Sequence, residues 1–399
     1  MPRPGQAGPS MAIGRTLRSW RDEKGFSLRE IEEASRKMPE PLTFEYLSRL
    51  ERGQLMPSLP KLCSLAEVYG RQISELVDLY EIEQFRGLVP KRGSYDLLRK
   101  LGIQGLEKGE VTKALACFLG ALDAAKRDQA PQQTLAVAYN NVGGALIRAC
   151  RYLLARNYLE EGLRWVESDH TRARLFDNLA IVHYHLDNLP LAELISRESM
   201  RLAAEDDALK TMTRATRAAI LLDLKRLVEA EELLREVIEE HQGSGNDPEE
   251  IRHRYNLGHC LVEQGQVEPG LEQLRTAAAK AAETGDPDLR AKSLFFFGRC
   301  LYKIGRIEEA AGPLTSSLRL SRQHNIRNES FHSAYYLWLL ARLRQELTEE
   351  ARLYEVVRQH RTWLQQRSEE GAAFDEYVSK RGTGARRRKR ASSLAADNS

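Results

Sequence analysis

Arg49 and Glu45 are side chains whose type and spacing suit the recognition of nucleic-acid bases. Both belong to the stretch Leu42–Gly53, in which Leu47 and Leu50 lie three residues apart and would face a small core. The guanidinium of Arg49 can donate to both N7 and O6 of a guanine, and the carboxylate of Glu45 can accept from the amino group of a cytosine. We therefore predict a helix that enters the major groove of double-stranded DNA. On the alternative interpretation, both side chains only solvate an exposed helix.

The predicted helix has its own start and stop signals. Thr43 is a good N-cap, because its hydroxyl can accept a hydrogen bond from an unpaired N–H group of the first turn. Gly53 can end the helix in the left-handed conformation. The side chains predicted to contact DNA are Thr43, Phe44, Glu45, Ser48, Arg49, Arg29 and Arg52. Of these, Arg29, Arg52 and Thr43 are predicted to touch phosphate, which positions a protein without reading sequence.

Further helices are needed to hold this one, and the flanking sequence predicts them. A first helix is expected over residues 12–24. A second is expected from residue 28 to about residue 37, because Ser27 and Glu30 have the spacing of a capping box. Pro39 and Pro41 prevent its continuation. A fourth helix follows Ser58, and a fifth short helix is expected to begin after Ser74 and to carry Leu76 and Val77.

These motifs resemble those of the Xre/Cro (lambda-repressor-like) family over residues 11–80. The resemblance is carried by the residues Ile13-Gly14-x-x-Leu17, Phe26-Ser27-Leu28-Arg29-Glu30-Ile31, Tyr46-Leu47-Ser48-Arg49-Leu50-Glu51-Arg52-Gly53 and Pro57-Ser58-Leu59. It implies a five-helix helix-turn-helix domain that binds an operator, usually as a dimer on a palindrome, with Phe44, Glu45 and Arg49 at the base-reading positions. The link between Ser27 and Thr43 is longer than the family pattern by about five residues, and extra loop length costs little stability.

The rest of the chain is repetitive. A small residue followed by another small residue twelve positions later recurs every 37 to 41 residues, and each such pair predicts two helices that pack closely. The pairs are Gly102/Ala114, Gly143/Ala155, Ala180/Ala192, Ala218/Ala230, Gly258/Gly270 and Gly298/Ala310, with a seventh, degenerate copy at Leu339/Ala351. The pattern resembles tetratricopeptide (TPR) repeats, although its period exceeds the 34 residues typical of them. Stacked pairs of this kind make a right-handed α-solenoid with a concave inner surface.

The predicted fold class is therefore all-α, with a helix-turn-helix domain followed by a TPR-like solenoid. The expected domains are a disordered N-terminus (1–10), the DNA-binding domain (11–80), a linker (81–94), about seven repeats (95–360), a capping helix (361–380) and a disordered basic tail (381–399). The tail contains Arg386-Arg387-Arg388-Lys389-Arg390, which could add salt-sensitive DNA affinity or only improve solubility.

Periodic asparagines predict a ligand-binding face. When the small residue that begins each pair is counted as position 8, Asn141, Asn178 and Asn256 fall at position 6 and Asn140 at position 5. An amide offers one acceptor and two donors, which suits the backbone of an extended peptide. We predict that these asparagines bind a peptide or protein ligand; alternatively, they bond neighbouring turns. Further candidate contacts are His259, Arg299 and Tyr302, with Tyr184 and Phe295 nearby.

Composition favours an intracellular protein without catalytic or metal chemistry. The five cysteines are widely scattered with no Cys-x-x-Cys pair, which fits a reduced, cytoplasmic protein. No run of residues approaches the length of a membrane-spanning helix. His183 and His185 are two residues apart and cannot chelate one metal from a single helix. We find no P-loop and no nucleophile elbow, so we expect neither an enzyme nor a cofactor.

In architecture the whole chain resembles the peptide-pheromone-sensing (RRNPP) regulators of Gram-positive bacteria. The resemblance implies a cytoplasmic homodimer whose solenoid sets the spacing of two DNA-binding domains, and a peptide that changes this spacing. One alternative is a DNA-tethered scaffold whose array docks a protein partner without a small ligand. Another is an adaptor whose first domain no longer binds DNA.

Overall fold

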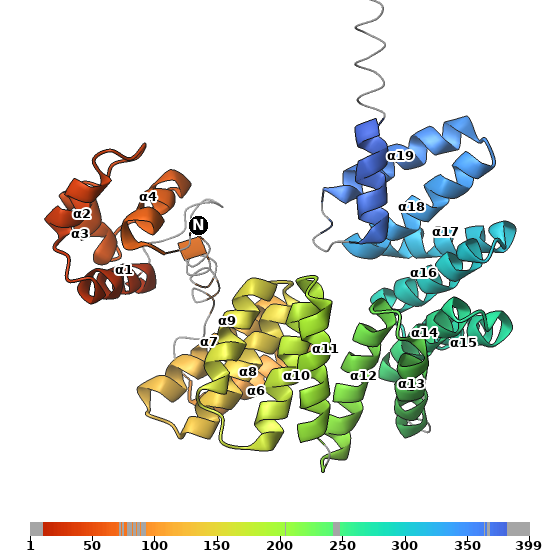
Figure 1. Cartoon of the computed structure of the whole chain (residues 1–399), viewed down its shortest axis with the longest axis horizontal. Helices are drawn as coiled ribbons and strands as arrows, with labels where there is room; N and C mark the ends of the chain where they lie inside the picture. Colours follow the sequence, from red (N-terminus) through yellow and green to blue (C-terminus); the bar gives the residue numbers. More distant parts are fainter. Residues whose placement is uncertain are drawn as a thin grey trace, which may run out of the picture. The chain divides into compact units, whose positions relative to one another are not determined.

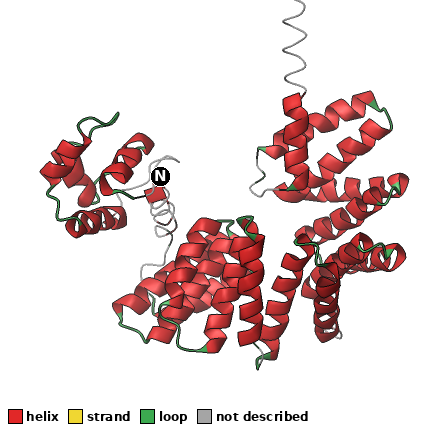
Figure 2. Cartoon of the chain, in the orientation of Figure 1, coloured by secondary structure: helices red, strands yellow, loops and turns green. Residues whose placement is uncertain are grey.

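The computed structural model describes residues 11–380, except residue 204, the stretches 242–247, 363 and 365–367, and most positions between 72 and 92. Every regular element in this part of the chain is helical and no strand occurs there, as Figure 2 shows, so the predicted all-α class is confirmed. The predicted disordered ends, 1–10 and 381–399, lie outside the described residues. The chain divides into two compact units, Met1–Glu167 and Ser168–Ser399. This division falls inside the predicted repeat array, in which each repeat contacts only its neighbours.

Four short helices come first: α1 (Met11–Glu23), α2 (Leu28–Ser35), α3 (Phe44–Glu51) and α4 (Leu59–Tyr69) (Figure 1). The predicted capping box of α2 is confirmed. The Ser27 hydroxyl accepts from the backbone N–H of Glu30, and the Glu30 carboxylate accepts from the backbone N–H of Ser27. The four helices bury one small core of Ile13, Leu17, Trp20, Ile31, Leu42, Leu47, Leu50, Leu62, Leu65, Ala66, Tyr69 and Leu76.

The predicted fifth helix lies mostly outside the described residues. Its expected N-cap, Ser74, and most of the linker after it belong to the undescribed positions. Leu76 and Val77 are helical, and Leu76 is fully buried in the core of the first four helices.

The remainder of the chain consists of paired helices. The first unit contains α6 (Tyr95–Glu107) with α7 (Val111–Arg127), and α8 (Gln132–Arg148) with α9 (Tyr152–Leu163). The second unit contains five pairs. They are α10 (Asp169–His185) with α11 (Leu189–Leu202), α12 (Asp207–Asp223) with α13 (Leu227–His241), α14 (Pro248–Glu263) with α15 (Val267–Glu283), α16 (Pro287–Lys303) with α17 (Ile307–Gln323), and α18 (Arg327–Leu343) with α19 (Leu347–Arg361).

The small residues do what the repeat pattern predicts, because they allow the two helices of a pair to approach closely. A Cβ added at Gly258 would lie 2.8 Å from the carbonyl oxygen of Gly270, and one added at Gly270 would lie 2.8 Å from that of Gly258. Both distances are too short for a real side chain. The turn that joins each pair contains a residue with positive φ, seven positions after the small residue; examples are Gly265 and Lys225.

The seventh pair is out of register with the prediction. Its positive-φ residue is Gln345, and counting back seven positions gives Trp338, not Leu339, as the equivalent of the small residue. The predicted pairing of Leu339 with Ala351 is therefore wrong by one residue. Trp338 is too large for the close approach seen at Gly258, and it packs instead against Tyr354, Phe374 and Tyr377.

Residues 369–380 form one more helical segment, which we call the terminal helix. It begins later than the predicted start at residue 361, because α19 continues through Arg361. Phe374 of this helix is 2% exposed and lies in the aromatic cluster around Trp338. Arg361 binds Asp375 with two hydrogen bonds, so the terminal helix is tied to α19.

Within the second unit the first helices of the pairs line one side. Successive first helices, from α10 through α12, α14 and α16 to α18, contact each other directly. In the described part of the unit, the second helices make no contacts of comparable extent with one another. The row of pairs therefore bends toward its first helices. We call the side lined by α10, α12, α14, α16 and α18 the inner face.

Candidate nucleic-acid interface and ligand-binding face

Helix α3 is held with its leucines inward and its N-terminal residues outward. The Thr43 hydroxyl accepts a hydrogen bond from the backbone N–H of Tyr46 at 3.2 Å, so the predicted N-cap is confirmed. Leu47 and Leu50 are each 1% exposed. Because these two side chains fix one face of the helix in the core, its opposite face is turned to solvent.

The outward side chains of α3 are available to a partner. Phe44 is 45% exposed, Glu45 and Arg49 are also exposed, and Ser48 is half-buried. Among the described residues, neither Glu45 nor Arg49 finds a side-chain hydrogen bond or an ion pair. Their polar groups can therefore form new hydrogen bonds without first breaking old ones.

The longer segment between α2 and α3 is closed by hydrogen bonds. The backbone N–H of Phe44 donates to the carboxylate of Glu32 on α2 at 3.0 Å. The backbone N–H of Leu42 donates to the buried hydroxyl of Ser35 at 2.9 Å. The additional residues therefore leave the start of α3 bonded to α2.

The side chains predicted to touch phosphate are all at the surface. Arg29 is exposed, and Arg52 is exposed while its Nε donates to the carbonyl of Ser48 at 3.0 Å. Thr43 uses its hydroxyl oxygen as an acceptor for the helix cap, so its O–H can still donate to a phosphate oxygen.

Sequence reasoning missed a clamp between α1 and the end of α3. The Arg21 guanidinium donates to both carboxylate oxygens of Glu51, at 2.7 and 3.1 Å, and the two side chains are 15% and 9% exposed. A Cβ at Gly14 would lie 2.6 Å from the carbonyl oxygens of Leu50 and Glu51, so α1 approaches the end of α3 very closely. Thirty positions separate Arg21 from Glu51, and no local pattern signals such a pair.

The predicted asparagines occupy only part of the inner face. Two positions before the small residue, successive first helices of the second unit carry Asn178, Thr216, Asn256, Phe296 and Tyr336. The amide column thus ends at α14 and gives way to aromatic rings. Asn178 and Asn256 are half-buried.

In the first unit, the two predicted asparagines of α8 differ in exposure. Asn141 is half-buried, whereas Asn140 is 5% exposed. Asn140 therefore offers little surface to a ligand in this conformation.

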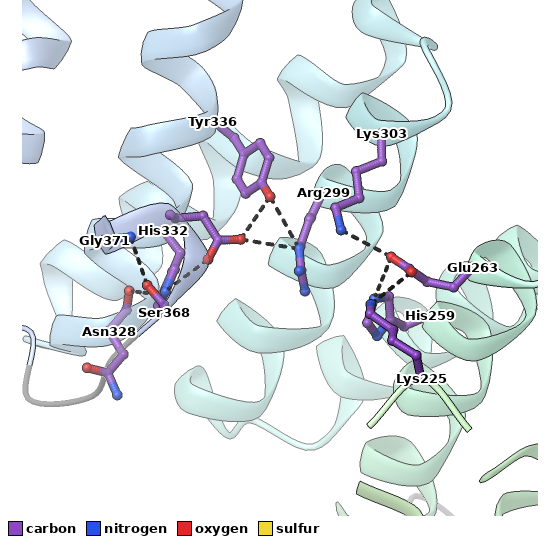
Figure 3. A network of polar contacts seen from close by, with 11 residues as sticks. Lys225, His259, Glu263, Arg299, Lys303, Asn328, His332, Tyr336, Ser368 and Gly371 are labelled. Atoms are coloured by element: carbon purple, nitrogen blue, oxygen red, sulfur yellow. Dashed lines mark hydrogen bonds and ion pairs between the residues drawn. The ribbon is translucent and has the colours of Figure 1, made fainter. Parts of the chain in front are cut away.

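A network of charged and polar side chains continues the inner face beyond the asparagines (Figure 3). Glu263, the last residue of α14, accepts hydrogen bonds from Lys225 at 3.0 Å and from Lys303 at 3.1 Å. Nε2 of His259 lies 3.4 Å from the same carboxylate. Burial lowers the pKa of His259, and the contact with Glu263 only partly offsets this, so the imidazole is neutral at neutral pH.

The second part of the network joins three elements around Glu370 of the terminal helix. The Tyr336 hydroxyl donates to Oε1 of Glu370 at 2.8 Å, and Nε of Arg299 lies 3.4 Å from the same oxygen. Nε2 of His332 lies 3.8 Å from the other carboxylate oxygen. Burial is the largest single influence on the pKa of Glu370 and would raise it, but the charges of Arg299 and His332 and the hydrogen bond from Tyr336 together hold that pKa below its usual value. The carboxyl is therefore ionised at neutral pH.

Aromatic rings border these charges. Tyr255 and Phe296 stack with their centroids 4.7 Å apart, and Tyr302 lies edge-on to Tyr336 at 5.2 Å. Of the predicted ligand contacts, the structure thus brings together His259, Arg299 and Tyr302 on neighbouring first helices. Such a face can bind a polar or charged ligand with an apolar part.

The described residues offer little for metal binding or nucleophilic catalysis. No group of three or more His, Cys, Asp or Glu side chains among them could hold a metal ion. Burial raises the pKa of the Cys117, Cys260 and Cys300 thiols, so these thiols are protonated at neutral pH. In the part of the chain that the structure describes, no helix combines the length and apolar character needed to cross a membrane.

Comparison with known proteins agrees with the division into two kinds of structure. Residues 12–79 match the family described as "Helix-turn-helix domain". A stretch of 90 residues is 37% identical to the HTH-type transcriptional regulator DdrOP3 of Deinococcus deserti, and this match covers 22% of the present chain and 65% of that relative.

Two solved structures share the fold of the repeats. The apo form of RapI aligns with a TM-score of 0.54 and 14% identity, covering 67% of this chain and 97% of RapI. The Rap conjugation gene regulator of the plasmid pLS20, solved in complex with the Phr* peptide, aligns with a TM-score of 0.51 and 14% identity, covering 89% of this chain and 98% of that one. Identity at this level shows fold alone. The chain thus has an N-terminal helix-turn-helix domain of the Xre type followed by TPR-like helix pairs that resemble those of the Rap proteins.

Proposed function

We propose that this protein is a sequence-specific transcriptional regulator that binds double-stranded DNA through α3 and responds to a peptide bound on its repeats. The observation that carries the first half is the state of α3, which is capped at Thr43, anchored by Leu47 and Leu50, and exposes Glu45 and Arg49 without partners among the described residues. Its match to the helix-turn-helix family, and to a relative described as a transcriptional regulator, supports the same proposal.

The second half rests on the inner face. Asn178, Asn256 and Arg299 lie on the first helices α10, α14 and α16, together with stacked aromatic rings that offer an apolar surface. The Rap conjugation gene regulator of the plasmid pLS20, which shares the repeat fold, was solved in complex with the Phr* peptide. In our proposal the protein is a homodimer on a palindromic operator, and a ligand alters DNA binding through its different affinity for two conformations of the repeats.

Replacing Arg49 tests the DNA contact. If Arg49 reads a guanine, Arg49→Ala should weaken binding to the cognate site by about 1–3 kcal/mol and relax specificity at that base. Fluorescence anisotropy with fragments of the upstream promoter region measures both effects. Arg18→Ala removes an exposed arginine from α1 and is the matched control, because its partner Asp22 is on the same helix. Unchanged affinity and specificity in Arg49→Ala would contradict the proposed base contact.

The ligand response is tested by changing two asparagines together. Asn141→Ala with Asn256→Ala should abolish the response to ligand while sparing DNA binding. The control is Asn188→Ala. Asn188 is an exposed asparagine at the start of α11, and its side chain does not cap that helix. The ligand itself should be identified by mass spectrometry of protein purified from its native host. A co-purified protein, with no peptide, would instead favour the DNA-tethered scaffold.

A further inference from the structure

Arg299 is held by only one of its nitrogens. Its Nε donates to the Tyr336 hydroxyl at 3.3 Å and lies 3.4 Å from Glu370. The two terminal nitrogens donate no hydrogen bond to any residue that the structure describes, and in Figure 3 the end of the Arg299 side chain points away from Tyr336. The edge of the guanidinium that could form two parallel hydrogen bonds is therefore unused.

The position of this unused edge is unusual for an arginine. The Arg299 side chain is only 15% exposed, yet this edge carries no partner among the described residues. The two terminal nitrogens are not among the described side-chain atoms that are fully buried without a partner, so they still reach solvent and a ligand can approach them. Arg299 nevertheless keeps its charge, since Tyr336 and Glu370 counter the effect of burial on its pKa.

The charges around Arg299 favour an anion. Lys225 and Lys303 share a single carboxylate, Glu263, and His259 nearby is neutral. The three cations of the network in Figure 3 thus face two carboxylates, Glu263 and Glu370, which leaves one positive charge uncompensated.

An apolar surface lies beside the charged one. Phe296 is on the same helix as Arg299 and stacks on the ring of Tyr255. The centroids of the Phe296 and His259 rings are 5.9 Å apart. If the anionic group of a ligand binds Arg299, the neighbouring part of the same ligand would therefore contact these aromatic rings.

We propose that Arg299 binds the carboxylate of a ligand on the inner face through its two terminal nitrogens, and that Glu370 of the terminal helix is its counter-ion when no ligand is bound. The ligand class is a molecule with a free carboxylate next to an apolar group, such as the C-terminal end of a peptide. This rests on the proposed use of the inner face for ligand binding. Glu370 lowers the affinity for the ligand, because its negative charge partly neutralises the guanidinium.

Benzoate, titrated against the full-length chain by ligand-observed NMR, tests the proposal, and benzamide is its uncharged equivalent. We expect benzoate to bind more tightly than benzamide by roughly tenfold, as charge-assisted hydrogen bonds predict. Arg299→Met should remove this preference. Arg275→Met, which removes an exposed arginine from the second helix α15, should retain it. Glu370→Gln keeps the size of the side chain and should tighten benzoate binding severalfold.

Three results would overturn the proposal: equal affinity for benzoate and benzamide, an equal loss in Arg275→Met and Arg299→Met, or weaker benzoate binding in Glu370→Gln. Thermal melts of each variant show whether it is folded, and Arg299→Lys, which keeps the charge without the fork, should bind benzoate with intermediate affinity. The titration contains no DNA. Its failure would leave the proposed DNA binding untouched, and a failure to bind DNA would leave its result standing.

Discussion

Asp177 on α10 makes the stability of this protein depend on pH in a direction opposite to that of most carboxylates. The side chain is 2% exposed, and its Oδ1 has no hydrogen-bond partner in the structure. Burial raises its pKa from 3.8 to about 7, and the Thr216 hydroxyl and the charge of Arg174 offset only part of this. At about 1.4 kcal/mol for each unit of pKa, ionising Asp177 costs about 4 kcal/mol more in the folded chain than in the unfolded chain.

The sign follows from which state holds the proton. Above about pH 4 the unfolded chain releases the proton, while the folded chain keeps it until about pH 7. The free energy of unfolding should therefore fall as pH rises through this window, and Asp177 should reduce it by a constant amount at higher pH. Asp177→Asn removes the titration. The difference in unfolding free energy, variant minus wild type, should increase by about 4 kcal/mol between pH 4 and pH 8.

Urea denaturation of the full-length chain at several pH values, followed by circular dichroism, measures this difference. An amide at Asp177 can lack an acceptor and cost about 1–3 kcal/mol, but that cost is the same at every pH and does not affect the slope. The control is Asp207→Asn, which changes an exposed carboxylate of the same unit. Its difference in unfolding free energy from the wild type should change much less with pH. A difference for Asp177→Asn that does not change with pH, or that grows as pH falls, would refute the reasoning.

Two further predictions concern the packing of each unit. Gly258→Ala should lower the free energy of unfolding by about 1–3 kcal/mol, because its Cβ would meet backbone and Leu274, whereas Gly312→Ala, which has open space around it, should raise it by up to about 1 kcal/mol. Urea titrations of both variants check the opposite signs, and a loss in Gly312→Ala would count against the argument. Glu51→Ala should destabilise the first unit by about 2–3 kcal/mol, since it removes the two-pronged partner of the nearly buried Arg21 guanidinium and leaves it only the more exposed Asp22, while Glu33→Ala at an exposed pair should cost less than about 0.5 kcal/mol. Thermal melts compare Glu51→Ala with Glu33→Ala, and equal melting temperatures for these two variants would exclude a structural role for the pair of Arg21 and Glu51.

Much of the architecture is predictable because it depends on rules that act within a few residues. The capping box at Ser27 and the N-cap at Thr43 are where the sequence places them. The small residues twelve positions apart correctly predict the helix pairs, because large side chains there would keep the two helices apart, and at Gly258 there is no room even for a Cβ. The seventh pair is out of register because Trp338 occupies the position of the small residue and removes the signal.

The sequence by itself determined the all-α class, the helix-turn-helix domain and the list of candidate ligand contacts. Only the tertiary structure decided how those candidates are used. It buries Asn140 and brings Glu370 from the end of the chain to Arg299. The physical reason is distance along the chain. A cap or a helix pair is fixed by neighbours a few positions away, whereas a contact between Arg299 and Glu370 exists only when the stacked pairs bend the first helices and the terminal helix together.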